Sequence, residues 1–206
     1  MAPNTAIVLV DPLNEFLHPD GKIYSQVSKS LESTSTVENI LKLVQAARSS
    51  QIPIYYALHQ PYRDGNYDGW QRMNHSFARI KSGRAFDEGS FGAKVFSGME
   101  PDLTNGDVVV SRHWNSSGFA NTDLDYQLRQ RDITHLILAG MVANTCLEST
   151  ARYARELGYH VTLLTDATAG FTVEAKEAAT QLIWPLIADE VFTVLEWVSN
   201  NNQTKV

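Results

Sequence analysis

The chain of 206 residues has a single cysteine, no excess of basic residues and no long apolar run. One cysteine cannot form an internal disulfide bond, which is typical of proteins that work in a reducing compartment. The 17 lysines and arginines are outnumbered by 23 aspartates and glutamates, which gives a net charge of -6. This charge disfavours general binding to nucleic acid or to an anionic membrane, because both attract basic surfaces.

No apolar stretch approaches the length of a membrane span, and the N-terminus lacks the basic region of a signal peptide. We therefore expect a soluble, cytoplasmic protein. No repeat and no linker rich in proline, glycine or serine divides the chain, so a single domain over residues 1–206 is expected. Residues 200–206 are expected to form a frayed tail.

Two kinds of apolar segment alternate along the chain. Short β-branched runs predict strands at 5–10, 53–58, 107–110, 135–139, 159–165 and 190–195. Apolar residues three or four positions apart predict helices at 37–47, 123–130, 147–158 and 173–186. This alternation implies right-handed crossovers and a parallel sheet between two layers of helices, in which ligands bind beyond the carboxyl ends of the strands.

Residues with acidic, basic or thiol side chains follow four of these strands. They are Asp11 after the first, Arg112 and His113 after the third, Cys146 after the fourth and Asp166 after the fifth. We expect them to gather at one edge of the sheet. Cys146 opens a helix, where unpaired N–H groups favour the nucleophilic thiolate; a buried structural cysteine is the alternative. Asp11 is costly to bury without a partner, unless it caps the following segment.

Three motifs occur in order along the chain. The first is an apolar strand ending in Asp11, followed by Asn14-Glu15-Phe16; the second is Ser117-Gly118-Phe119 with Thr122-Asp123-Leu124; the third covers residues 140–146 and continues to Asp166. In these residues the chain resembles the isochorismatase-like cysteine hydrolases, which include nicotinamidases, N-carbamoylsarcosine amidases and isochorismatases. We expect a three-layer α/β/α sandwich with a six-stranded, mainly parallel Rossmann-like sheet in the order 3-2-1-4-5-6.

The resemblance implies a catalytic triad of aspartate, lysine and cysteine. Cys146 would be the nucleophile and Asp11 its base. The resemblance also implies an oxyanion hole made by the backbone N–H groups of Val142 and Cys146, next to a cis peptide bond between Met141 and Val142.

The family's lysine is missing from the end of the third strand. Counting forward from Asp107 places Arg112 in its position, and counting back from Ser117 places His113 there, so we expect a one-residue insertion. Arg112 could hold a carboxylate ionised but stays protonated, whereas His113 could also carry a proton. The alternative for Arg112 is an ion pair that shapes the end of the sheet. Lys94 is the nearest lysine in sequence and could reach the site from its loop, but the spacing does not require it.

The segment 60–106 is long for a compact α/β protein and predicts a lid or a subunit contact. We expect aromatic residues to form a wall around a small, mostly apolar substrate; core or interface packing is the alternative. They are Phe16, Trp114 and Phe119 together with Tyr62, Tyr67, Trp70, Phe77, Phe86, Phe91 and Phe96 of this segment. The Asp-x-His metal motif of nicotinamidases does not occur, so no metal and no cofactor is expected. The resemblance implies a homo-oligomer, either a dimer or a tetramer.

Three hypotheses for function remain open. The first is thiol-dependent hydrolysis of a C–N bond of amide type in a small molecule. The second is isochorismatase-type hydrolysis of a vinyl ether, which needs an acid at Asp11 but not the thiol. The third is a non-catalytic relative that binds or assembles, which the missing lysine favours.

Overall fold

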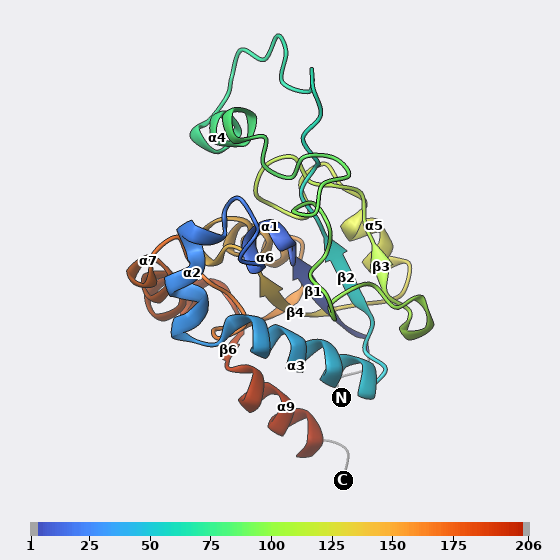
Figure 1. The fold of residues 1–206 in the computed structure, drawn as a ribbon. Coiled ribbons are helices and arrows are strands. Elements are labelled where there is room, and N and C mark those ends of the chain that lie inside the picture. The colour runs from blue at the N-terminus through green and yellow to red at the C-terminus, as the bar shows by residue number, and fades with distance from the viewer. Residues whose placement is uncertain (1–3, 204–206) are drawn as a thin grey trace.

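The computed structural model describes residues 4–203, and a six-stranded sheet lies at its centre (Figure 1). The strands are β1 (Thr5–Val10), β2 (Ile54–Ala57), β3 (Val108–Val109), β4 (His135–Gly140), β5 (His160–Leu164) and β6 (Glu190–Phe192). All neighbouring strands are parallel, in the order β3-β2-β1-β4-β5-β6. The predicted fold class and strand order are confirmed.

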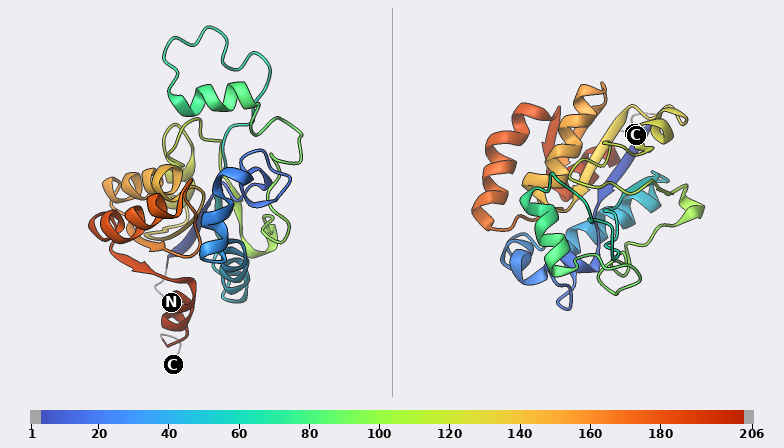
Figure 2. Two further views of the ribbon diagram at one scale, coloured as in Figure 1. Left: turned by 60° about the vertical axis from the view of Figure 1, so that its left-hand side comes forward. Right: turned by 90° about the horizontal axis from the view of Figure 1, so that it is seen from above.

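Helices cover both faces of the sheet (Figure 2). Successive side chains of β1 point to opposite faces, as in any strand: Ile7 and Leu9 enter one core, Val8 and Val10 the other. The first core is closed by α1 (Asn14–Leu17), α2 (Tyr24–Ser33), α3 (Thr36–Ser49) and α9 (Val194–Gln203). The second is closed by α5 (Leu124–Arg129), α6 (Glu148–Glu156) and α8 (Trp184–Ile187).

The predicted helices at 37–47, 123–130 and 147–158 are confirmed, but the one at 173–186 is interrupted. It consists of α7 (Val173–Ala178), a π-helical turn η3 (Ala179–Ile183) and α8. Pro185 stands at the start of α8 and has no N–H to give to a continuous helix, which explains the break.

The C-terminal prediction is wrong in two respects. The sixth strand ends at Phe192, and residues 194–203 form α9 instead of a strand end and a frayed tail. Thr193 and Glu196 form a reciprocal cap at its start: Glu196 accepts from the Thr193 N–H at 2.7 Å, and Thr193 Oγ1 accepts from the Glu196 N–H at 3.2 Å. Residues 204–206 of the predicted tail lie outside the described residues.

The strands β1 and β4 meet closely at their carboxyl ends. Gly140 has φ +112°, and a Cβ atom there would lie 2.0 Å from the Val10 carbonyl oxygen. Only glycine fits both the backbone conformation and the space. The Met141 N–H then donates to the same Val10 oxygen at 2.8 Å. This contact places the residue after β1 beside the turn that leads to Cys146.

The segment between β2 and β3 extends beyond the carboxyl ends of the strands and carries α4 (His75–Gly83) and a short 3₁₀ turn, η1 (Leu103–Asn105) (Figures 1 and 2). Sequence periodicity did not predict α4, and α1 and α2 were not predicted either. Asn74 caps α4, with its side chain accepting from the Phe77 N–H at 2.9 Å. Among the described residues, no helix combines the length and the apolar character needed to cross a membrane.

Candidate functional site

Asp11 is the first residue after β1 and lies at the centre of the site. Its backbone has φ +47°, a left-handed conformation that aspartate tolerates, and its N–H donates to the Ala57 carbonyl at 3.0 Å. The side chain is 1% exposed, and Oδ1 accepts from the His59 N–H at 2.6 Å. Burial alone would raise the pKa of Asp11, but the charges and hydrogen bonds of His113 and His59 outweigh it and lower the pKa.

His113 faces Asp11 and is completely buried. Its Nε2 lies 3.2 Å from each carboxylate oxygen of Asp11, and its Nδ1 lies 3.2 Å from the Asn115 carbonyl. Both ring nitrogens thus face acceptors, so we assign the doubly protonated imidazolium, which can donate to both. Burial would lower the pKa of His113, but the Asp11 carboxylate and the Asn115 carbonyl outweigh it and raise the pKa.

The structure places His113, not Arg112, opposite Asp11. Beside β2, the Val110 N–H donates to the Tyr56 carbonyl and the His113 N–H donates to the Leu58 carbonyl. Two steps along β2 therefore match three steps along the chain after β3, which is the one-residue insertion that the sequence predicts. Arg112 instead donates from Nη1 to the His59 carbonyl at 3.2 Å.

Cys146 lies in the π-helical turn η2 (Ala143–Leu147), directly before α6. Its sulfur lies 3.9 Å from the Asn115 carbonyl oxygen, the same oxygen that His113 contacts. Burial and the negative charge of Asp11 raise the pKa of the Cys146 thiol well above its usual range. The expectation that the helix start favours a resting thiolate is therefore wrong: the thiol keeps its proton, with Asp11 facing it.

The turn before Cys146 has the backbone form that the resemblance implies, with a cis peptide bond between Met141 and Val142. The Val142 N–H is directed at the Cys146 sulfur and opposes the rise in its pKa. The Ala143 N–H donates to the Ala169 carbonyl at 2.8 Å, which ties the turn to the loop after β5. The N–H group of Val142 is thereby held next to the sulfur.

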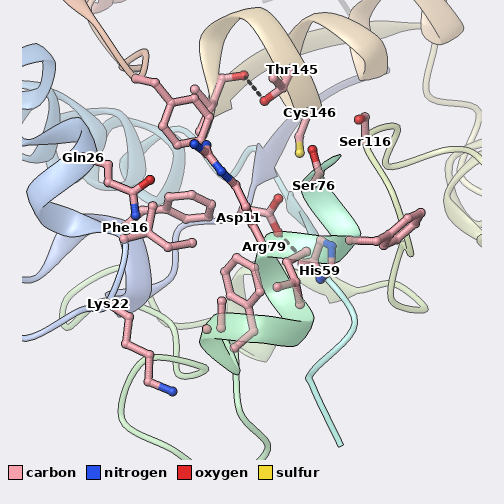
Figure 3. Close-up of a pocket in the computed structure, with 18 of the residues that line it drawn as sticks. Asp11, Phe16, Lys22, Gln26, His59, Ser76, Arg79, Ser116, Thr145 and Cys146 are labelled. Carbon is pink, nitrogen blue, oxygen red and sulfur yellow. Dashed lines mark hydrogen bonds between the residues drawn. The ribbon is translucent and has the colours of Figure 1, made fainter. Parts of the chain in front are cut away.

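A cavity of about 440 Å³ opens above Asp11 and Cys146 (Figure 3). It is lined by the site residues Asp11, His59, Asn115, Ser116, Val142, Thr145 and Cys146, and by Phe16, Lys22, Ile23 and Gln26 from the segment after β1. The α4 region adds Ser76, Phe77, Arg79, Ile80, Ser82, Gly83, Ala85 and Phe86, and Phe171 completes the lining. Its size suits a small molecule.

Of the aromatic residues predicted to line the pocket, Phe16, Phe77 and Phe86 do so. Trp70 and Trp114 pack against each other, with ring centroids 5.5 Å apart, and lie outside the lining. Phe119 faces the other side of the sheet and stacks on Tyr153 at 5.9 Å. The prediction overlooked that these rings have partners of their own in the protein.

Two further candidates lie away from the cavity. Asp166 accepts from the Val194 N–H at 2.8 Å and from the Asn39 side chain at 3.2 Å, so it joins α9 and α3. Lys94 is exposed and does not line the cavity. Within residues 4–203, no three or more histidine, cysteine, aspartate or glutamate side chains form a group that could hold a metal ion.

Sequence reasoning predicted Phe77 of α4 as a wall residue but missed the polar residues that α2 and α4 bring to the cavity. Figure 3 shows Ser76 and Arg79 entering from α4 and Gln26 from α2. The Asn74 cap signals the start of α4, but no local pattern shows which way its side chains point.

The whole site falls within a segment that matches a known family. Residues 5–191 match the isochorismatase domain. The chain is 32% identical to the ureidoacrylate amidohydrolase RutB of Variovorax paradoxus, over 81% of this chain and 69% of that protein. Its fold is similar to a crystal structure of a cysteine hydrolase from Pseudomonas syringae (TM-score 0.79, 29% identity, covering 95% and 91% of the two chains). It is also similar to N-carbamoylsarcosine amidase from Thermoplasma acidophilum (TM-score 0.65, 26% identity, 92% and 95%). The chain belongs to the isochorismatase family of hydrolases.

Proposed function

We propose that this protein hydrolyses a C–N bond of amide type in a small molecule, with Cys146 as nucleophile and Asp11 as general base. The observation that carries the proposal is the buried Asp11 carboxylate, which His113 keeps ionised while it faces a protonated thiol. Within residues 4–203, Asp11 Oδ2 accepts no hydrogen bond of good geometry. An ionised carboxylate with such an oxygen is suited to take the thiol proton.

The proposed reaction has two halves. As the sulfur attacks the substrate carbonyl, its proton passes to Asp11, a C–S bond forms and the carbonyl oxygen becomes an oxyanion. The N–H groups of Val142 and Cys146 stabilise that oxyanion. The C–N bond then breaks and the proton moves from Asp11 to the leaving nitrogen. In the second half, Asp11 takes a proton from water and the hydroxide adds to the thioester. The C–S bond then breaks to release the acid, and the proton moves from Asp11 to the departing sulfur, which restores the thiol and the carboxylate.

In this proposal His113 provides the positive charge next to the base, Asp11. It stabilises the ionised Asp11 and, through the Asn115 carbonyl that it shares with the sulfur, stays close to the nucleophile. Unlike a lysine, it can lose its charge near neutral pH. Arg112 adds positive charge nearby but donates to the His59 carbonyl and not to Asp11.

The relatives support amide-type chemistry. One is named as an amidohydrolase of ureidoacrylate and another as an amidase of N-carbamoylsarcosine, and both names describe cleavage next to a carbonyl in a small molecule. The alternative is vinyl-ether hydrolysis of isochorismate with Asp11 as the acid. The low pKa of Asp11 argues against it, because a proton donor must hold its proton in the resting enzyme.

The test is a screen of small amides, ureides and isochorismate against the wild-type protein and two variants. Cys146→Ala should abolish amide hydrolysis, and Asp11→Asn should reduce it to near background, while thermal unfolding shows that both variants fold. Isochorismate turnover that survives Cys146→Ala but not Asp11→Asn would establish the vinyl-ether alternative. Amide turnover that persists in Cys146→Ala would overturn the proposed nucleophile.

A further inference from the structure

Arg79 differs from the other arginines that the structure describes. Of the ten arginines in the chain, eight donate a hydrogen bond or form an ion pair, and within residues 4–203 only Arg72 and Arg79 do neither. Arg72 is exposed on the surface, away from the cavity lining. Arg79 lines the cavity, and Figure 3 shows its side chain extending from α4 into the space above Asp11. A guanidinium with five donors and no acceptor is suited to hold an anion.

The charges around the cavity are arranged for such an anion. Asp11 is the one acidic residue in the lining, and His113 and the His59 N–H already bind it, so it does not pair with Arg79. Lys22 is the second cation of the lining, and its Nζ donates to the Arg84 carbonyl at 2.6 Å. The cavity lining therefore contains one ionised carboxylate, whose charge is balanced by His113, and two cations.

The cavity also has an apolar part. Phe16 and Phe86 line it, with ring centroids 5.4 Å apart, and the Phe86 N–H is fixed by the buried carboxylate of Glu15 at 2.6 Å. A ligand that fits this arrangement has an amide at one end, a short hydrocarbon or planar middle and a negative group at the other end.

We propose that Arg79 binds a carboxylate carried by the substrate, so that the enzyme selects small amic acids, in which one carboxyl group is free and another is amidated. This proposal rests on the function proposed above, because it takes Cys146 as the point where the amide is cleaved. A guanidinium binds a carboxylate through two parallel hydrogen bonds, so Arg79 would orient the substrate as well as attract it.

The test measures binding without turnover, in the Cys146→Ala protein. Malonamate, succinamate and glutaramate are compared by calorimetry with their methyl esters, which have the same amide but no charge. At least one acid should bind about tenfold more tightly than its ester, and the preference should weaken with added salt. A second substitution, Arg79→Gln, should abolish the preference, and Arg79→Lys should keep part of it.

Arg72→Gln is the matched control, because it removes an arginine of the same segment that also lacks a partner but lies outside the cavity. It should leave the preference unchanged. Equal binding of all three acids and their esters, or a preference that survives Arg79→Gln, would overturn the anion site. A preference that depends on Arg79 together with no turnover of any amide by the wild-type protein would uphold the anion site and reject the proposed hydrolysis, so the two failures are distinguishable.

Discussion

The floor of the cavity and its α4 wall are held in different ways. The floor consists of Asp11, Val142 and Cys146 at the carboxyl ends of the strands, together with His113, which contacts Asp11 but does not itself line the cavity. Asp11, His113 and Val142 are at most 1% exposed. The wall consists of the α4 side chains, among which Ser76 and Arg79 are exposed.

Different contacts explain this contrast. Backbone hydrogen bonds of the sheet fix the floor, whereas α4 is attached by aromatic packing and by polar contacts such as that of Asn74 with Asn115 at 3.2 Å. A reaction needs groups that are held to a fraction of an ångström, and substrate choice tolerates more adjustment. In the reaction proposed above, the floor would therefore set the chemistry and the wall the choice of substrate.

Removing the base from the floor should have the largest effect on activity. Asp11→Asn keeps the left-handed backbone, which asparagine also adopts, and should lower kcat/KM for amide hydrolysis by about 10⁴-fold. Steady-state kinetics on the best amide measures this, and a variant that keeps most of the wild-type kcat/KM would contradict the role of Asp11 as the base.

A pair of glycine substitutions compares the rigidity of the two regions. Gly140→Ala forces a Cβ atom to within 2.0 Å of the Val10 carbonyl and should cost about 4 kcal/mol or more of unfolding free energy. Gly69 also has a positive φ, but a Cβ atom there meets nothing within 4 Å, so Gly69→Ala should cost about 1 kcal/mol. Urea unfolding measures both, and equal costs would show that the floor is no more constrained than the loop before α4.

The floor was largely predictable from sequence, whereas only the aromatic residues Phe77 and Phe86 of the wall region were predicted. Strand β1 and its following aspartate follow from a run of residues that is buried on both faces, so local pattern and final environment agree. The one-residue insertion before His113 could be counted, but its position depends on the pairing with β2, which the sequence alone does not fix.

The misses have physical reasons. The position of α4 depends on contacts between distant segments, such as that of Glu15 with the Phe86 N–H, 71 residues away. Arg79 was therefore not predictable, since helical spacing cannot show that α4 faces the sheet edge. In contrast, α9 could have been predicted from Thr193 and Glu196, whose spacing is that of a capping box. The apolar β-branched residues beside them favoured a strand instead.

Changing the cation of the floor should move the pH dependence of the reaction. His113 carries its charge only below its raised pKa, so kcat/KM should fall as the pH rises through that value. In His113→Lys the amine stays charged to about pH 10, so the alkaline limb should move to higher pH. His113→Gln should lose about 10²-fold in kcat/KM and show no such limb. An unchanged alkaline limb in His113→Lys would show that another group controls it.

Stability provides an independent check of the same ion pair. A histidine whose pKa is higher in the folded than in the unfolded chain stabilises the fold fully below about pH 6.5 and stops doing so as the pH rises through the folded value. Asp11 has a lowered pKa in the folded chain, so its contribution to the stability of the fold is present above about pH 4 and is lost as the pH falls. The stability difference between wild type and His113→Gln should therefore be largest between these limits and shrink on the alkaline side.

The smallest effects are expected from the aromatic residues of the upper cavity. Phe16→Leu reshapes the lining and should raise KM about threefold, because one side of the substrate loses contacts. Trp70→Leu is the matched change outside the lining and should alter KM by less than about twofold, although it removes packing against Trp114. Steady-state kinetics on the best amide measures both. A larger effect of Trp70→Leu would mean that Trp70 and Trp114 contact the bound substrate. The wall would then include residues that do not line the cavity in the free protein.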